Sequence, residues 1–289
     1  MVRRSPNPWA LCVVVVVVSG VVGCLPTGPK MPATQVASSD PAAELDPGQP
    51  KQGPPIATPG ERMSYLVSLH GIALADLVLE TNGTVALGQR DALMVEIRVD
   101  TRALASMVSA VHDRYTSWLD LGTGRPLRFH AQEAATPNQR VNEETEATFA
   151  PGQYPVKLLQ GTGAGLEEVQ VVHSAPFDFV SFLVFLRGWE GAVGSELVVD
   201  VMRSRYTWRA RIVVAGHDNL VTALGDLPVV RFEGEGVRLM RDGTVDPKSD
   251  RRRFTIWVSD DADRVPVKLA AHTDYGDVKL ELSAYTAGR

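Results

Sequence analysis

Cysteine is scarce in this chain, whose 289 residues include only Cys12 and Cys24. Both cysteines lie near the N-terminus, so the long remainder of the chain cannot be stapled by disulfides. The folded part must be stabilised by its hydrophobic core, and about 230 residues are enough to build one.

Basic residues are also in the minority, with 29 Lys and Arg against 34 Asp and Glu and a net charge of −5. Beyond the N-terminal residues they form one run, Arg251-Arg252-Arg253, which is more typical of a solvated loop than of a binding patch. This composition argues against nucleic acid as a partner.

The sequence also lacks the usual catalytic and metal-binding motifs. It has no Gly-x-Ser-x-Gly, and its histidines fall in separate segments without the short spacings of a zinc site. The glycine-rich run at 161–165 resembles a phosphate loop only superficially, because a strand rather than a helix is expected after it. We therefore predict no catalytic residue, no metal ligand and no cofactor.

The first residues are typical of a bacterial lipoprotein signal. Arg3 and Arg4 precede a valine-rich apolar run that ends in Gly23-Cys24 and is too short to span a bilayer comfortably. By resemblance to such signals, residues 1–23 are removed and Cys24 carries the acyl chains, which anchor the protein to a membrane. Leu25, rather than aspartate, favours the outer membrane, facing the periplasm. The alternatives are a secreted free thiol and an uncleaved anchor.

Residues 24–59 are dominated by Pro, Gly, Ala, Ser and Thr and contain no aromatic residue. Such a segment cannot bury enough apolar surface to offset the entropy of ordering it, so a disordered tether is expected. A single β-rich domain should then occupy residues 60–289.

Alternation of apolar and polar residues dominates that domain and predicts many short strands. The clearest runs are 254–259, 265–272 and 278–285, and a hairpin with its turn at Gly71 opens the domain. Further turns are expected at Asn82-Gly83 and at 216–219. The segment 144–149 is expected to be a polar edge strand, and 151–165 a loop-rich region. The predicted fold is mainly β: a curved antiparallel sheet or open half-barrel meander.

Two helices are expected to pack against this sheet. A short amphipathic helix is predicted from Ala103 to His112, capped by Thr101. An almost wholly apolar helix is predicted from Phe177 to Leu186, after the start signal Ser174-Ala175-Pro176. Core packing is the plain interpretation of the second helix. The functional one is a cavity for an acyl chain, lined by Phe177, Val180, Phe182, Leu183 and Leu186.

Several segments resemble a known family: Gly60-Glu61-Arg62, the helix ending Phe185-Leu186-Arg187, Ile256-Trp257-Val258-Ser259-Asp260-Asp261, Arg264-Val265-Pro266 and Tyr275-Gly276. The chain resembles, from Gly60 onward, the bacterial envelope family catalogued as domain of unknown function 3108. The resemblance implies a periplasm-facing, antiparallel β protein with a curved sheet, and it brings no catalytic residues. Its motif residues also have a structural use, as turn, strand-edge and packing residues: Trp257, Asp260, Asp261, Arg264, Pro266 and Gly276.

Together these features favour a non-catalytic outer-membrane lipoprotein that binds a lipid-like ligand in envelope maintenance. A scaffold for another envelope protein is the alternative, and an envelope hydrolase is a third hypothesis.

Overall fold

The computed structural model describes residues 55–102, 111–134, 143–150, 152–160, 164–172, 175–273 and 276–289. In chain order its elements are β1 (Arg62–Leu69), β2 (Ile72–Leu87), β3 (Arg90–Thr101), β4 (His112–Asp120), β5 (Pro126–Glu133), β6 (Glu143–Thr148), β7 (Gln153–Gln160), β8 (Ala164–Val171), β9 (Phe177–Asp178), α3 (Phe179–Gly188), β10 (Glu196–Arg203), β11 (Tyr206–Thr222), β12 (Gly225–Arg238), β13 (Arg252–Ser259), β14 (Pro266–Thr273) and β15 (Gly276–Thr286). Cys24 and most of the predicted tether lie outside the described residues.

All the strands join one 15-stranded sheet, in the order β8-β7-β6-β5-β4-β3-β2-β1-β15-β14-β13-β12-β11-β10-β9. Neighbouring strands in this order pair antiparallel, except that β9 pairs parallel with β10. The first strand, β1, pairs with the last, β15. The prediction of a mainly β protein with an antiparallel sheet is confirmed. The first and last of its described strands lie side by side in the middle of the sheet.

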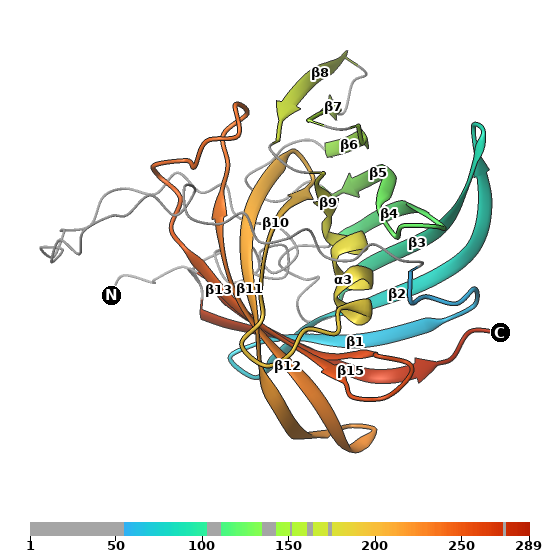
Figure 1. Ribbon diagram of the computed structural model, residues 1–289, viewed down its shortest axis with the longest axis vertical. Helices are drawn as coiled ribbons and strands as arrows, with labels where there is room; N and C mark the ends of the chain where they lie inside the picture. The colour runs from blue at the N-terminus through green and yellow to red at the C-terminus, as the bar shows by residue number, and fades with distance from the viewer. Residues whose placement is uncertain are drawn as a thin grey trace, which may run out of the picture.

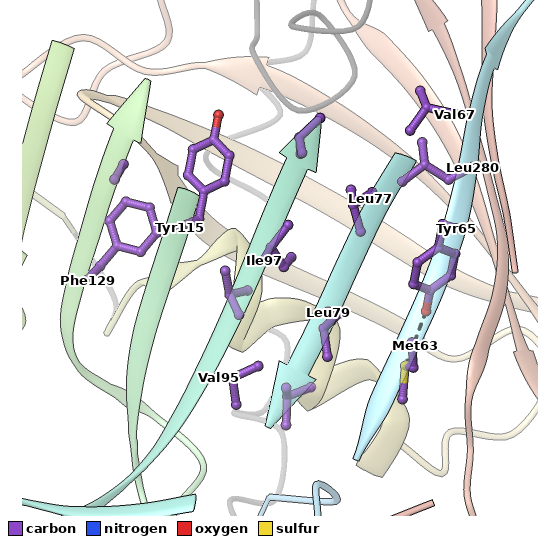
Figure 2. Packing of buried hydrophobic residues seen from close by; sticks show 14 of the residues in the cluster. Met63, Tyr65, Val67, Leu77, Leu79, Val95, Ile97, Tyr115, Phe129 and Leu280 are labelled. Atoms are coloured by element: carbon purple, nitrogen blue, oxygen red, sulfur yellow. Dashed lines mark hydrogen bonds between the residues drawn. The ribbon is translucent and has the colours of Figure 1, made fainter. Parts of the chain in front are cut away.

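The sheet curves around α3, which lies between the strands β2 to β5 on one side and β10 to β13 on the other (Figure 1). The inner face of the sheet carries the alternate apolar residues that the sequence pattern predicts. On β1, for example, Met63, Tyr65 and Val67 are buried. Figure 2 shows these side chains continuing onto β2, β3, β4 and β5, with the helix behind them. Each fully buried side chain of this kind contributes about 1.5–3 kcal/mol, so the inner face accounts for much of the stability.

Side chains also tie the hairpin of β10 and β11 to strands far from it in the sheet. Arg203 Nη2 and Ser204 Oγ donate to the Glu133 carboxylate of β5 at 2.7 Å and 2.5 Å. Thr207 Oγ1 donates to Gln170 Oε1 of β8 at 2.7 Å. These bonds hold the curvature of the sheet around α3.

Two predicted turns are wrong, for the same physical reason. Asn82-Gly83 lies within β2, where the register with β3 shifts between Thr81 and Gly83. The expected turn at 216–219 lies within β11, where the register with β12 shifts between Val214 and Gly216. Glycine suits a β-bulge as well as a turn, and the long-range pairing decides between them.

Strand β6 is not an edge strand, because β5 and β7 pair with it on either side. The expected loop-rich region at 151–165 contains β7, which pairs with β8 along its whole length. The polar residues there are compatible with a strand that has one solvated face, which is why composition misidentified both segments.

The main helix begins at Phe179 rather than Phe177, because Phe177 and Asp178 pair with β10 as β9. Most of the predicted amphipathic helix, 103–110, lies outside the described residues, and its last residue, His112, is the first residue of β4. Within the described part of the chain, no helix has the length and apolar character needed to cross a membrane.

Candidate functional site

Helix α3 is fixed at its N-terminus by a buried carboxylate. Asp178 Oδ1 accepts from the backbone N–H groups of Val180 and Ser181, each at 2.9 Å, and Ser117 Oγ donates to Oδ2 at 2.6 Å. Burial raises the pKa of Asp178 to about 6, while these hydrogen bonds oppose the rise. The N-cap therefore joins the helix to β4 and fixes its position inside the sheet.

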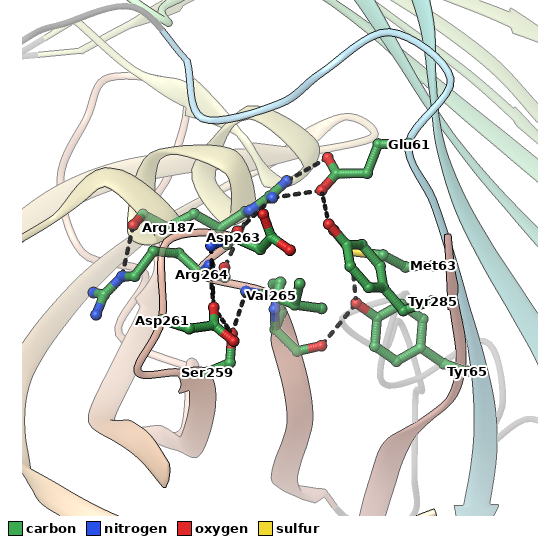
Figure 3. Close-up of polar contacts among 11 residues, drawn as sticks. Glu61, Met63, Tyr65, Arg187, Ser259, Asp261, Asp263, Arg264, Val265 and Tyr285 are labelled. Atoms are coloured by element: carbon green, nitrogen blue, oxygen red, sulfur yellow. Dashed lines mark hydrogen bonds and ion pairs between the residues drawn. The ribbon is translucent and has the colours of Figure 1, made fainter. Parts of the chain in front are cut away.

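The C-terminus of α3 is fixed by a buried ion pair (Figure 3). Arg187 Nη1 and Nη2 donate to the two oxygens of Glu61 at 2.7 Å and 2.6 Å, and both side chains are only 3% exposed. Tyr285 OH also donates to Glu61 Oε1, at 3.1 Å. Arg187 further donates to the carbonyls of Asp263 and Arg264, at 2.7 Å and 3.1 Å. One guanidinium thus connects the helix, the start of β1 and the loop between β13 and β14.

That loop contains the most specific motif residues. Asp261 Oδ1 accepts from Ser259 Oγ at 2.8 Å and from the backbone N–H groups of Asp263 and Arg264 at 3.1 Å and 3.0 Å. Arg264 returns to the helix end, donating to the carbonyls of Arg187 and Trp189 at 3.0 Å and 3.1 Å. The structure therefore brings together segments that resemble the family but are far apart in the sequence.

The other motif residues lie around the same strands. Asp260 contacts His217 Nδ1 at 2.9 Å, and the Pro266 carbonyl accepts from Tyr65 OH at 2.8 Å. Lys268 Nζ lies 5.7 Å from the centre of the Trp257 ring. Gly276 has a φ of 113° at the start of β15, a conformation that favours glycine. Every one of these contacts is made within the fold itself.

An apolar cavity of about 240 Å³ lies between α3 and strands β10 to β14. Phe179, Phe182 and Leu183 cover it from the helix. Strand residues form its floor: Val201, Ala210, Phe254, Ile256, Leu269 and Ala271. The space between helix and sheet is therefore only partly filled.

The predicted ligand-lining residues divide into two groups. Phe182 and Leu183 line the cavity. Phe177, Val180 and Leu186 are at most 1% exposed and pack into the core away from it. Phe177 belongs to β9, and Val180 lies on another face of α3. Leu186 shares the helical face of Phe182 and Leu183 but lies one turn further along the helix.

Small residues at adjacent positions create the cavity. Ala210 of β11 pairs with Gly236 of β12, and both line the opening. Gly234, two residues earlier on the same face, is covered by the Phe254 ring, since a Cβ there would lie 2.2 Å from a ring atom. No local sequence pattern predicts this arrangement, because it depends on the pairing of separate strands.

One end of the cavity is polar and cationic. Arg203, Arg252, Arg253, His272 and Thr273 line that end, and no aspartate or glutamate is among the described residues that line the cavity. Sequence reasoning assigned the run 251–253 to a solvated loop and so missed Arg252, which belongs to β13 and is half-buried.

Metal binding has no support in the described residues, where no three His, Cys, Asp or Glu side chains come close enough to hold an ion. Four of the histidines instead contact one carboxylate each: His112 with Asp100, His130 with Glu144, His217 with Asp260 and His272 with Asp277.

The sequence model of a family described as a protein of unknown function, DUF3108, matches residues 64–283. The chain belongs to the DUF3108 family. The matched residues include α3 and every residue that lines the cavity beside it, whereas Glu61 and Tyr285 lie just outside the matched range. No curated protein matches the chain.

This DUF3108 chain is similar to solved structures. A beta-barrel-like protein of domain of unknown function DUF1849 from Brucella abortus has a TM-score of 0.54 at 12% identity, over 81% of this chain and 100% of that one. A protein described as a putative lipoprotein from Parabacteroides distasonis has a TM-score of 0.40 at 8% identity, over 82% of this chain and 100% of that one. The first of these similarities concerns the fold alone.

Proposed function

We propose that this protein is a non-catalytic envelope lipoprotein that holds a lipid-like ligand in the cavity beside α3. The observation that carries the proposal is the cavity itself, which is apolar where Phe182, Ile256 and Leu269 line it and cationic at one end. Burying an alkyl chain there would contribute about 0.8 kcal/mol per methylene.

The size of the cavity limits the ligand. At about 30 Å³ for a group of the size of water, 240 Å³ holds on the order of eight such groups. This is enough for one alkyl chain of medium length and too small for two.

The predicted acylation of Cys24 and the tether at 24–59 support the location that this function needs. Acyl chains on Cys24 would hold the domain at the outer membrane, on its periplasmic side, and the tether would let the cavity reach lipids. A binding role without catalysis fits a cavity whose described lining has no carboxylate to act as an acid or base.

A scaffold function is the second candidate, and the edge strand β8 favours it. Leu166 is 65% exposed and Val169 52% exposed on β8, which pairs only with β7 among the described strands. An unpaired strand edge with apolar side chains can add a strand from another protein. A photoreactive amino acid at Val169 would crosslink an envelope protein in cells if this is correct.

Photo-crosslinking also tests the lipid-binding function on the full chain in vesicles of envelope lipids. A photoreactive medium-chain fatty acid should label peptides containing Phe182, Leu183 or Phe254. Gly236→Leu should abolish this labelling, because its side chain would occupy the cavity, while Gly236→Ala adds only a Cβ that has ordinary contacts. Equal labelling of the wild type and Gly236→Leu would contradict the proposal.

A further inference from the structure

The strand directions place the polar lining residues at one end of the cavity. Arg203 is the last residue of β10, Arg252 is the first of β13, and Thr273 is the last of β14. Neighbouring strands from β10 to β14 pair antiparallel, so β10, β12 and β14 run in one direction and β11 and β13 in the other. The end of β10, the start of β13 and the end of β14 therefore fall at the same edge of the sheet. The apolar residues Ile256 and Leu269 pair with each other further along.

Arg252 lies on the inner face of the sheet. Alternation along β13 places it on the same face as Phe254 and Ile256, which line the cavity. Its partner in register on β12 is Gly236, which has no side chain to separate Arg252 from the opening. A positive charge therefore lies directly at the end of an apolar cavity.

Arg203 supplies a second observation that points to a ligand. Its side chain is 11% exposed, and its Nη2 donates to Glu133 and to Tyr115 OH, at 2.7 Å and 3.0 Å. Its buried Nε–H has no hydrogen-bond partner in the described structure. A buried donor without an acceptor is costly, and an oxygen from a bound molecule would remove that cost.

The charge balance at this end favours an anion. Glu133 neutralises much of the charge of Arg203, but Arg253 is exposed and has no ion pair in the described part of the chain. Arg253 thus adds positive potential at the opening, where no described lining residue is acidic.

We propose that the cavity takes a single-chain amphiphile with an acidic headgroup, a carboxylate or a phosphate. The headgroup lies at the end formed by Arg203 and Arg252, and the alkyl chain lies between α3 and strands β11 to β14. This inference rests on the proposed function and specifies its ligand class. Guanidinium groups bind carboxylates and phosphates with charge-assisted hydrogen bonds, which supplies the selectivity.

The test compares three photoreactive probes of equal chain length on the full chain in vesicles: a fatty acid, an alkyl phosphate and a fatty alcohol. The wild type should label its cavity peptides with at least one acidic probe about tenfold more than with the alcohol. The preference between the two acidic probes identifies the headgroup as carboxylate or phosphate.

The variants assign the effect to Arg252. Arg252→Gln should lose about tenfold in acidic labelling with alcohol labelling unchanged, and Arg252→Lys should retain most of it because the charge is kept. Arg251→Gln is the matched control, since Arg251 is exposed, pairs with Glu235 at 2.5 Å and does not line the cavity. Its labelling should equal that of the wild type.

Equal labelling by acid and alcohol in the wild type, or an unchanged preference in Arg252→Gln, would overturn the headgroup assignment and leave lipid binding intact. Absence of cavity labelling by all three probes would overturn the proposed function itself.

Discussion

Replacement of Glu61 by glutamine is expected to lower the free energy of unfolding by about 3–5 kcal/mol. Glu61 and Arg187 are each 3% exposed, and glutamine would leave the Arg187 guanidinium buried without a counter-charge. The Arg187 bonds to the carbonyls of Asp263 and Arg264 remain in this variant, so the loss reflects the charge and not the whole junction.

Urea unfolding of the full chain, followed by tryptophan fluorescence, measures this loss. With a slope of about 1–3 kcal/mol per molar urea, the midpoint should fall by more than about 1 M. Arg62→Gln is the matched control, because Arg62 is the next residue but pairs with Glu80 at 43% and 29% exposure. Solvent screens that pair, so its loss should change stability by less than about 1 kcal/mol.

The double variant Glu61→Gln, Arg187→Gln distinguishes a buried charge from simple loss of contacts. It should be less destabilised than the sum of the two single variants, because neither charge is then left alone. A Glu61→Gln midpoint equal to that of Arg62→Gln, or additive single effects, would refute the reasoning.

Three further predictions concern α3 and its surroundings. Burial raises the pKa of Asp178 to about 6, above its unfolded value, so its contribution to stability falls as pH rises from about 4 to 6. Asp178→Asn keeps a capping oxygen and should remove this part of the pH dependence. Between pH 4 and 7, the wild type should lose on the order of 2–3 kcal/mol more free energy of unfolding than the variant in urea titrations. Identical pH profiles of the two proteins would contradict this prediction. Gly276→Ala should cost about 1–3 kcal/mol, because φ is 113° and the new Cβ would lie 2.2 Å from the His70 ring. Gly71→Ala shares the positive φ but has no atom within 4 Å, so it should lose less in the same thermal unfolding assay, and an equal loss would exclude the clash. Gly236→Leu should leave the melting temperature within a few degrees of the wild type while excluding ligand, and unfolding at room temperature would show that the cavity has no room.

Sequence reasoning predicted most of the sheet, because strands with one buried face show the period of two directly. Asp260 and Asp261 lie between β13 and β14, and Pro266, which the sequence placed at a strand edge, is the first residue of β14. The glycines were the weak point: Gly71 makes the predicted turn, but Gly83 and Gly216 make bulges. Local sequence does not distinguish these uses, because the choice depends on which strand pairs opposite.

The candidate site was predictable only on its helical side. Phe182 and Leu183 were identified from the apolar sequence of the helix, and the structure places them on the cavity. Gly236 and Arg252 were missed, since their meeting depends on the register between β12 and β13. The ion pair of Glu61 with Arg187 joins residues 126 positions apart, so no local sequence pattern could predict it either.

The pairing of β1 with β15 has a consequence for how this protein is made. In the centre of the sheet β1 pairs with β15, which is synthesised after all the other described strands. Forming this pair closes a loop of more than 200 residues. Contacts of such high sequence separation slow folding, because chain entropy is lost before they form. The nascent protein therefore cannot complete its core until β15 has been synthesised. A chain truncated before β15 lacks the strand that joins β1 to β14 in the sheet.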